Sequence, residues 1–178
     1  MGMHHISFLD ASTVGDVDLG QLASLGQLEA YPVTSPDQLD ERLQHASIAI
    51  TNKVVIDAAA LQNAPHLKLI CIAATGTNCV DLAAAKAAGI TVCNVAGYST
   101  ASVTQHTLGL LINLATGMNR YAGELSQWAQ SPIFTRLDYP MIDLAGKTLG
   151  IIGLGTIGKS VAKAAQGFGM NVVALSRD

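Results

Sequence analysis

The octet GLGTIGKS at positions 153–160 constrains the fold more than any other stretch of the chain. An apolar run at 149–152 precedes it and an Ala-rich run follows it, which is the pattern of a buried strand, a tight turn and a helix. As G-x-G-x-x-G the octet is a dinucleotide fingerprint, and as G-x-x-x-x-G-K-[ST] it is a nucleoside triphosphate P-loop. Both patterns require an α/β unit built on a parallel sheet.

Three observations favour the dinucleotide interpretation. Leu154 and Ile157 are apolar, and a second strand pattern at 171–175 returns at the spacing of a short βαβ unit. A P-loop enzyme also needs a strand ending in Asp to hold magnesium, and no such strand follows. Lys159 and Ser160 are then two solvated residues of the first helical turn.

The three glycines of this loop have separate tasks. Gly153 permits the turn, Gly155 lets a pyrophosphate approach the backbone, and Gly158 lets helix and strand pack closely. The helix N-terminus adds N–H donors and a partial positive charge. We therefore expect the pyrophosphate to be cradled by the backbone of Gly153, Leu154, Gly155, Thr156, Ile157 and Gly158.

The coenzyme is left open between NAD and NADP. A ribose-binding acid is expected about 20 residues after the glycines. Asp178 meets that count, but Ser176 is the first polar residue after the 171–175 strand, and Arg177 follows it. Because Arg donates charge-assisted hydrogen bonds to phosphate, Ser176 and Arg177 give a slight preference for NADP. Arg177 as an ordinary solvated residue is the alternative.

Short Ile- and Val-rich runs alternate with longer Ala-, Leu- and Gln-rich runs along the whole chain, which predicts repeated βα units in an α/β fold. The expected strands are 6–9, 28–33, 48–52, 67–73, 91–95, 148–152 and 171–175. The expected helices are 18–25, 36–45, 58–63, 82–88 and 159–168, with Ser35 and Pro36 beginning the second and Gly89 ending the fourth. A boundary near 97–99 divides the chain into domains 1–98 and 99–178.

The longest expected helix spans 101–124, with Ser99 or Thr100 as its cap. Apolar spacing predicts that one of its faces is buried against a sheet or a partner chain, and this face consists of Val103, Thr107, Leu110, Leu111 and Leu114. The following segment, 127–144, loses this periodicity and is expected to be an irregular arm. A homodimer through the 101–124 helix is the expected assembly.

Composition excludes several classes of protein. The chain is 49% hydrophobic and 13% charged with a net charge of -3, and it has no run of Lys or Arg. This argues against a nucleic-acid surface or a polybasic membrane anchor. The apolar stretch 107–115 is too short to span a bilayer, and no cleavable signal opens the chain. Cys71, Cys79 and Cys93 are expected to be buried, reduced thiols of a cytoplasmic protein, and no metal-ligand spacing occurs.

Four segments, 73–82, 94–100, 103–106 and 144–153, strongly resemble the D-isomer-specific 2-hydroxyacid dehydrogenases, and segment 94–100 is most similar to the glycerate dehydrogenase, or hydroxypyruvate reductase, branch. The resemblance covers essentially the whole chain. It implies a flavodoxin-like substrate domain followed by the first βαβ part of a Rossmann-like NAD(P)-binding domain, with an active site in the cleft between them. The implied reaction is hydride transfer between NAD(P)H and a small 2-oxo acid of the hydroxypyruvate or glyoxylate type.

The resemblance also assigns site residues. It implies that the backbone of Thr75, Gly76 and Thr77 grips the substrate carboxylate, as an anion nest of exposed N–H groups can. Asn52 and Lys53, at the tip of the third strand, could line the same pocket, although Lys53 could equally be a solvated loop residue.

Val103 and Thr104 are expected to border the nicotinamide by the same resemblance. The family's catalytic Arg, Glu and His are implied beyond Asp178, so no catalytic residue is assigned in this chain. His106 is expected to be a packed or capping residue instead. The expectation is an inactive fragment of the enzyme, and the alternative is a truncated, non-catalytic dimerising or binding module. A more distant alternative, an S-adenosylhomocysteine hydrolase-like enzyme, shares only the glycine loop.

Overall fold

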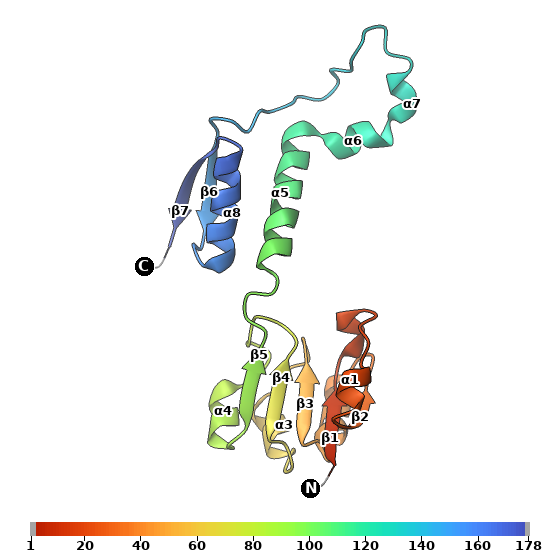
Figure 1. Cartoon of the computed structure of the whole chain (residues 1–178), viewed down its shortest axis with the longest axis vertical. Helices are drawn as coiled ribbons and strands as arrows, with labels where there is room; N and C mark the ends of the chain where they lie inside the picture. Colours follow the sequence, from red (N-terminus) through yellow and green to blue (C-terminus); the bar gives the residue numbers. More distant parts are fainter. Residues whose placement is uncertain (1–2, 177–178) are drawn as a thin grey trace. The chain divides into compact units, whose positions relative to one another are not determined.

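The computed structural model of the chain describes residues 3–176 and divides into two compact units, Met1–Ala96 and Gly97–Asp178 (Figure 1). The first unit is built on a five-stranded sheet and the second on a two-stranded sheet. All strand pairs in both sheets are parallel. The α/β class predicted from the alternating sequence pattern is confirmed.

The sheet of the first unit has the strand order β2-β1-β3-β4-β5. This is the doubly wound order of flavodoxin-like folds, in which the connection reverses between β1 and β3. Ligands bind outside the carboxyl ends of the strands at such a reversal. The strands are β1 (His4–Phe8), β2 (Gly26–Ala30), β3 (Ile48–Thr51), β4 (Leu69–Ile72) and β5 (Thr91–Asn94).

The helices of this unit are shorter than the sequence pattern predicted. They are η1 (Ala11–Val14), α1 (Gly20–Ala23), η2 (Pro36–Gln38), α2 (Leu39–Leu43), α3 (Ala58–Gln62) and α4 (Leu82–Ala87). Side-chain caps set two of the beginnings, because Asp57 accepts from the Ala60 N–H and Asp81 accepts from the Ala84 N–H, each at 2.9 Å. As expected, Gly89 follows α4 with a left-handed φ of 70°.

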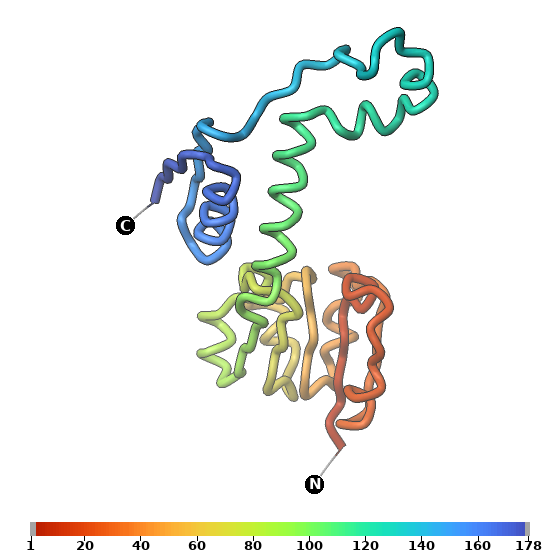
Figure 2. The backbone as a smooth tube through the Cα atoms, turned by 45° about the horizontal axis from the view of Figure 1, so that its top comes forward, coloured from red at the N-terminus to blue at the C-terminus, as the bar shows by residue number. Residues whose placement is uncertain are grey.

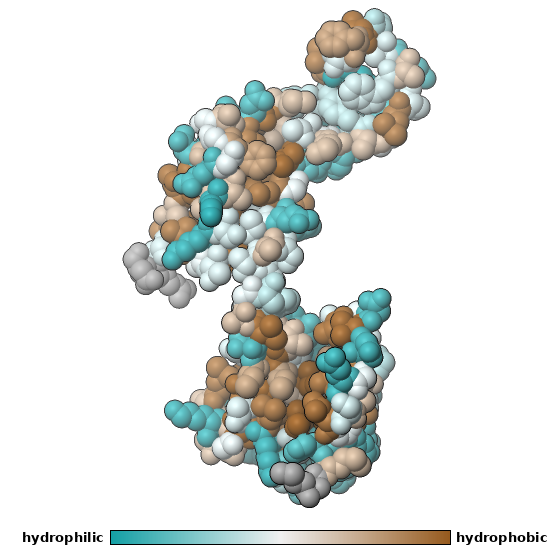
Figure 3. Space-filling model, viewed as in Figure 1, coloured by the Kyte–Doolittle hydropathy of each residue, from teal (hydrophilic) through white to brown (hydrophobic). Residues whose placement is uncertain are grey.

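Two apolar clusters hold the first unit together, one on each face of the sheet. The larger cluster packs α2, α3 and α4 against side chains such as Ile70 and Ile72. The smaller cluster is formed by Ile6, Phe8 and Ile50, with residues of α1 packed on them. Figure 2 shows the backbone of these layers, and Figure 3 shows apolar residues gathered over one face of the sheet.

The second unit contains the strand, turn and helix predicted from the glycine octet. Strand β6 (Thr148–Ile152) pairs with β7 (Asn171–Leu175), and α8 (Thr156–Gly167) connects them. Both strands have the predicted bounds. Helix α5 (Thr100–Thr116) packs along α8, as Figure 1 also shows.

The single helix predicted over 101–124 is wrong, because the chain breaks at Gly117. This glycine has φ 61° and ψ 25°, the left-handed conformation that ends a helix, and its N–H donates to the Asn113 carbonyl at 2.8 Å. Two shorter helices follow, α6 (Met118–Gly123) and α7 (Leu125–Trp128). At the other end of α5 the Ser99 side chain makes no capping hydrogen bond.

The predicted face of α5 is not the one that α8 covers, and its burial against a partner chain stays a prediction. Packing against α8 buries Thr104 and Ala115, whereas Val103, Leu110 and Leu114 on the predicted face are exposed. A neighbouring helix instead of a sheet therefore decides which side of α5 is covered. No helix in residues 3–176 combines the length and apolarity that crossing a membrane requires.

The irregular segment after α7 is tied back to α6 by a polar and aromatic cluster, which we call the arm cluster and define as Tyr121, Glu124, Trp128, Arg136 and Tyr139. Arg136 forms an ion pair with Glu124 at 2.8 Å, and the Tyr139 hydroxyl donates to Glu124 at 2.5 Å. The Tyr121 ring lies 5.6 Å from Trp128 and 5.1 Å from Tyr139, centroid to centroid. Side chains therefore order a segment that has no regular structure of its own.

Candidate functional site

The loops that follow β3 and β4 are joined at the carboxyl edge of the five-stranded sheet. The Ile56 N–H donates to the Cys79 carbonyl at 2.8 Å, and the Asp81 N–H donates to the Ile56 carbonyl at 3.1 Å. The Ala73 N–H also donates to the Thr51 carbonyl at 2.8 Å. These bonds bring Asn52 and Lys53 to the same sheet edge as residues 75–77.

The loop at 75–77 presents a row of unpaired backbone donors. Among the hydrogen bonds of residues 3–176, none uses the N–H of Thr75, Gly76 or Thr77. The loop is held from behind, because Asn94 donates to the Thr75 carbonyl at 2.7 Å and the Thr75 hydroxyl donates to the Val95 carbonyl at 3.0 Å. Successive free N–H groups on an anchored loop form an anion-binding concavity.

Asp10, two residues after the end of β1, is a site residue that sequence reasoning missed. Its carboxylate accepts the N–H groups of Asn52, Lys53 and Val54 at 2.6–3.2 Å, and the residue is only 3% exposed. It therefore shapes the β3 loop at the point where the strand order reverses. A polar residue directly after an apolar strand was the available signal, but its partners lie more than 40 positions away.

Lys53 is exposed, and Asn52 is half-buried. The Lys53 charge reaches the neighbouring Cys79 thiol, whose pKa is raised by burial while the lysine works in the opposite direction. A positive charge at the edge that carries the free N–H groups of residues 75–77 adds to the attraction of this edge for an anion.

The glycine loop of the second unit has the geometry of a phosphate cradle. Gly153 has φ 93°, and its N–H donates to the Leu175 carbonyl at 2.8 Å. A Cβ on Gly158 would lie 2.2 Å from the Gly153 carbonyl oxygen, so only glycine lets α8 approach the turn. A Cβ on Gly155 would meet no other part of residues 3–176 within 4 Å, which leaves room for a ligand at the backbone.

Five successive N–H groups in this loop, those of residues 154–158, take part in none of the hydrogen bonds of residues 3–176. The helix begins at Thr156, three residues earlier than predicted, and so the last three of these donors lie in its first turn. Lys159 is exposed, as expected of a solvated helix residue, and the Lys159 N–H makes the first turn's bond to the Gly155 carbonyl. The arrangement fits an anionic group at a helix N-terminus.

The remaining predicted cofactor residues have different environments. Ser176 is exposed at the tip of β7, and Arg177 lies outside the described residues. On α5, Val103 is 37% exposed, whereas Thr104 is 8% exposed and its hydroxyl has no hydrogen-bond partner among residues 3–176. The His106 side chain is exposed and takes part in none of the hydrogen bonds of residues 3–176, so the expectation of a packed or capping histidine is wrong.

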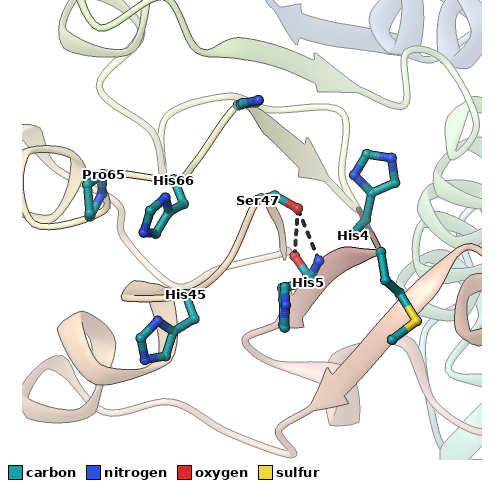
Figure 4. Close-up of a pocket in the computed structure, with 8 residues that line it drawn as sticks. His4, His5, His45, Ser47, Pro65 and His66 are labelled. Atoms are coloured by element: carbon teal, nitrogen blue, oxygen red, sulfur yellow. Dashed lines mark hydrogen bonds between the residues drawn. The ribbon is translucent and has the colours of Figure 1, made fainter. Parts of the chain in front are cut away.

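A hollow at the opposite, amino-terminal edge of the five-stranded sheet gathers histidines (Figure 4). It is lined by His4 and His5 of β1, His45 after α2 and His66 before β4. Figure 4 shows their rings spread around the hollow instead of converging. Within residues 3–176, no three His, Cys, Asp or Glu side chains are placed to hold a metal ion.

The cysteines differ from the prediction that all three are buried. Cys79 is buried, Cys71 is half-buried and Cys93 is exposed. Cys93 lies on β5, which is an edge strand, and this position leaves its side chain open. The prediction for Cys93 is therefore wrong.

Comparison with known proteins identifies the family. The family model for the catalytic domain of D-isomer-specific 2-hydroxyacid dehydrogenases matches residues 8–175. Glycerate dehydrogenase of Methylorubrum extorquens is 44% identical over 172 residues, which cover 95% of this chain and 54% of that enzyme. Hydroxypyruvate reductase of Blautia hydrogenotrophica is 37% identical over 165 residues, covering 90% and 51% respectively.

A solved structure agrees with the sequence relatives. The TT0316 protein of Thermus thermophilus superposes with a TM-score of 0.75 at 30% identity, over 98% of this chain and 56% of that one. The chain spans about half the length of the relatives it matches. Within that span it belongs to the D-isomer-specific 2-hydroxyacid dehydrogenase family.

Proposed function

We propose that this chain is the part of an NAD(P)-dependent D-2-hydroxyacid dehydrogenase that binds a small 2-oxo acid and the pyrophosphate of the dinucleotide. The substrate would be of the hydroxypyruvate, glycerate or glyoxylate type. The observation that carries the proposal is the pair of unpaired amide rows, at 75–77 and 154–158, each following a strand of a parallel sheet. Family membership supports the same assignment.

The substrate end rests on residues 1–98, which we propose as the substrate domain. The N–H groups of Thr75, Gly76 and Thr77 would donate to the carboxylate of the oxo acid. Asn52 and Lys53 would line the same pocket, with Asp10 orienting them through their backbone. Because the amides are already aligned by Asn94 and Val95, little ordering is needed when the anion binds.

The cofactor end rests on residues 99–178, the start of an NAD(P)-binding domain. The N–H groups of residues 154–158 would hold the pyrophosphate, and the space beside Gly155 would admit it. We propose Val103 and Thr104 beside the nicotinamide. Ser176 and Arg177 would contact the adenosine ribose, with a slight preference for NADP. A bound nicotinamide supplies the hydride of the reaction.

The chain's own contribution to the chemistry is binding and orientation. We assign no catalytic residue in this chain, because among residues 3–176 no acidic or basic side chain forms a hydrogen bond with the 75–77 loop. Without a proton donor and a cation to polarise the 2-oxo group, turnover by these residues alone is expected to be absent.

A dimerising module is the second candidate, and one observation favours it. The side of α5 that α8 leaves uncovered exposes Leu110 and Leu114, the latter by 81%. Large exposed apolar side chains in a row indicate a contact surface. We propose that this side of α5 and the start of α6 form the contact of a homodimer.

The test combines intact mass, binding and turnover. In ¹H–¹⁵N spectra of the chain, hydroxypyruvate should shift the amide signals of 75–77, and NADPH or NADH should shift those of 154–158. Intact mass first establishes that the sample is the 178-residue chain. Oxidation of NADH or NADPH by this sample in the presence of hydroxypyruvate should then be undetectable. Unmoved amide signals would refute the binding assignment, and turnover at that mass would refute the absence of catalytic residues.

A further inference from the structure

Cys71 and Cys93 lie side by side on neighbouring strands of the first unit. The parallel register of β4 and β5 pairs Cys71 directly with Cys93. Side chains at paired positions of neighbouring parallel strands point to the same face of the sheet. Cys71 packs against the smaller cluster of Ile6, Phe8 and Ile50, so this face is the one opposite α2, α3 and α4.

The spacing of the two cysteines suits a disulfide. Neighbouring strands lie about 4.8 Å apart, and the Cα atoms of disulfide-bonded cysteines are about 4.4–6.8 Å apart. The Cβ atoms must approach by roughly 1 Å. Because β5 is an edge strand and, within the described part of the chain, pairs with β4 alone, it can move toward β4 without disturbing a second strand.

The two thiols are not equivalent. Cys93 is exposed, whereas Cys71 is half-buried. Burial raises the pKa of the Cys71 thiol, and the adjacent Cys93 raises it further, so the thiolate fraction of Cys71 at neutral pH lies below that of an ordinary cysteine. Cys93 is therefore the thiol that meets a reagent first, and Cys71 is the neighbour that can resolve the product.

We propose that Cys71 and Cys93 form an oxidisable dithiol that closes to an intramolecular disulfide when the protein meets a small disulfide such as glutathione disulfide. The Cys93 thiolate attacks one sulfur of the reagent, forms a mixed disulfide and releases one glutathione thiolate. The Cys71 thiolate then attacks the Cys93 sulfur and releases the second glutathione. The cysteines lose two electrons and two protons, and the reagent is reduced to two glutathione thiols.

Closure of this bond would act beside the 75–77 loop. Cys93 directly precedes Asn94, which holds the Thr75 carbonyl, and Val95 N–H donates to the Ala74 carbonyl at 3.0 Å. Drawing β5 toward β4 at Cys93 moves the anchors of that loop. Strained cross-strand disulfides are also the readily reduced ones, so the modification is expected to reverse with an added thiol.

The test uses Cys79→Ser, which removes the buried third cysteine and leaves only the proposed pair. After treatment with glutathione disulfide, its non-reduced monomer should lose the mass of two hydrogens. Trypsin should then yield peptides 69–86 and 87–120 joined by a disulfide. Phenylarsine oxide, which bridges paired thiols, should add once to the reduced protein and block this oxidation.

Single variants separate the two roles. Cys71→Ser should stop at one glutathione on Cys93, whereas Cys93→Ser should react at least about tenfold more slowly. Cys93→Ala serves if the serine variant fails to fold by circular dichroism. Uptake of two glutathiones by Cys79→Ser, a disulfide only between two chains, or equal reaction rates in the Cys71 and Cys93 variants would overturn the proposal.

Discussion

The two units of this chain stabilise themselves in opposite ways. In the first unit, helices α2, α3 and α4 close a continuous apolar cluster over a five-stranded sheet. In the second unit, a two-stranded sheet and two packed helices bury only a few side chains, and large apolar residues such as Phe134 and Ile152 are almost completely exposed. The first unit buries enough apolar surface to hold a small domain together, whereas the second leaves apolar surface available for other contacts.

Their candidate binding loops differ in the same way. The 75–77 loop depends on long-range bonds, through Asn94 and through the Asp10 carboxylate that shapes the adjoining β3 loop. The 153–158 loop depends on local glycine geometry at Gly153 and Gly158. Substitutions that disturb the 75–77 loop should therefore lower the stability of the first unit. Substitutions in the 153–158 loop should mainly lower the affinity for its ligand.

The largest expected effect is that of Asp10→Ala. The substitution leaves three backbone N–H groups of the β3 loop without their buried acceptor, and it should lower the free energy of unfolding of the first unit by about 3 kcal/mol. Urea unfolding followed by circular dichroism measures this. Asp16→Ala, which removes an exposed acid nearby, is the control. Equal stability of the two variants would show that Asp10 does not support the loop.

This difference between local and distant interactions also separates what the sequence predicted from what it did not. Strands β6 and β7 have their predicted bounds because the glycine turn and the apolar runs define them locally. The strand order of the first unit agrees with the flavodoxin-like expectation. The helix at 36–45 was predicted too long, because periodicity does not show that the chain first forms the 3-10 turn Pro36–Gln38.

Features that depend on distant partners were missed. The Asp10 carboxylate accepts hydrogen bonds from N–H groups 42–44 positions away in the sequence, and no local sequence pattern indicates such a pairing. The side of α5 that is covered within the chain is chosen by α8, and apolar spacing alone did not indicate it. Gly117 was a visible signal for the helix break, but a glycine inside a helical pattern can also be tolerated.

The second prediction concerns Gly158→Ala. The added methyl would overlap the Gly153 carbonyl oxygen at 2.2 Å, so α8 must move away from the turn at a cost of about 2 kcal/mol. Because this movement displaces the N–H groups of the loop, the affinity for NADPH should also fall about tenfold or more. Amide hydrogen exchange in α8 and calorimetric titration measure the two effects.

Gly155→Ala is the matched variant for that experiment. Its methyl would meet no atom of residues 3–176 within 4 Å apart from its chain neighbours, and its φ of -74° suits alanine, so stability should be unchanged. The methyl would nevertheless occupy the approach to the backbone, so NADPH affinity should still fall. Full affinity in both variants would contradict the phosphate role of the loop.

The third prediction tests the exposed surface of the second unit. If α5 forms a homodimer contact, Leu114→Glu should raise the dimer dissociation constant about tenfold, because burying a leucine contributes about 1.5 kcal/mol or more. Sedimentation velocity over a concentration series measures this. Val17→Glu, at an exposed apolar residue of the first unit, should leave association unchanged. A monomeric wild-type chain at all concentrations would exclude the contact.

The smallest expected effect is a pH dependence confined to the arm cluster. The hydrogen bond from Tyr139, followed by the Arg136 interactions, lowers the pKa of Glu124 below its ordinary value of 4.5. A lowered pKa in the folded state stabilises the cluster above pH 4.5, and this stabilisation is lost as the pH falls through the lowered value. Because Glu124 is near solvent, only the local arrangement should change and the fold of both units should persist.

Trp128, the single tryptophan of the chain, reports on this cluster because its ring lies against Tyr121. Its fluorescence should change in wild type as the pH falls below 4.5, while Glu124→Gln should show the low-pH signal throughout and little further change. Tyr139→Phe, which removes the main cause of the shift, should move the midpoint upward. A titration identical in wild type and Glu124→Gln would mean that the arm is held by its aromatic contacts, so that apolar packing governs the second unit even where its residues are charged.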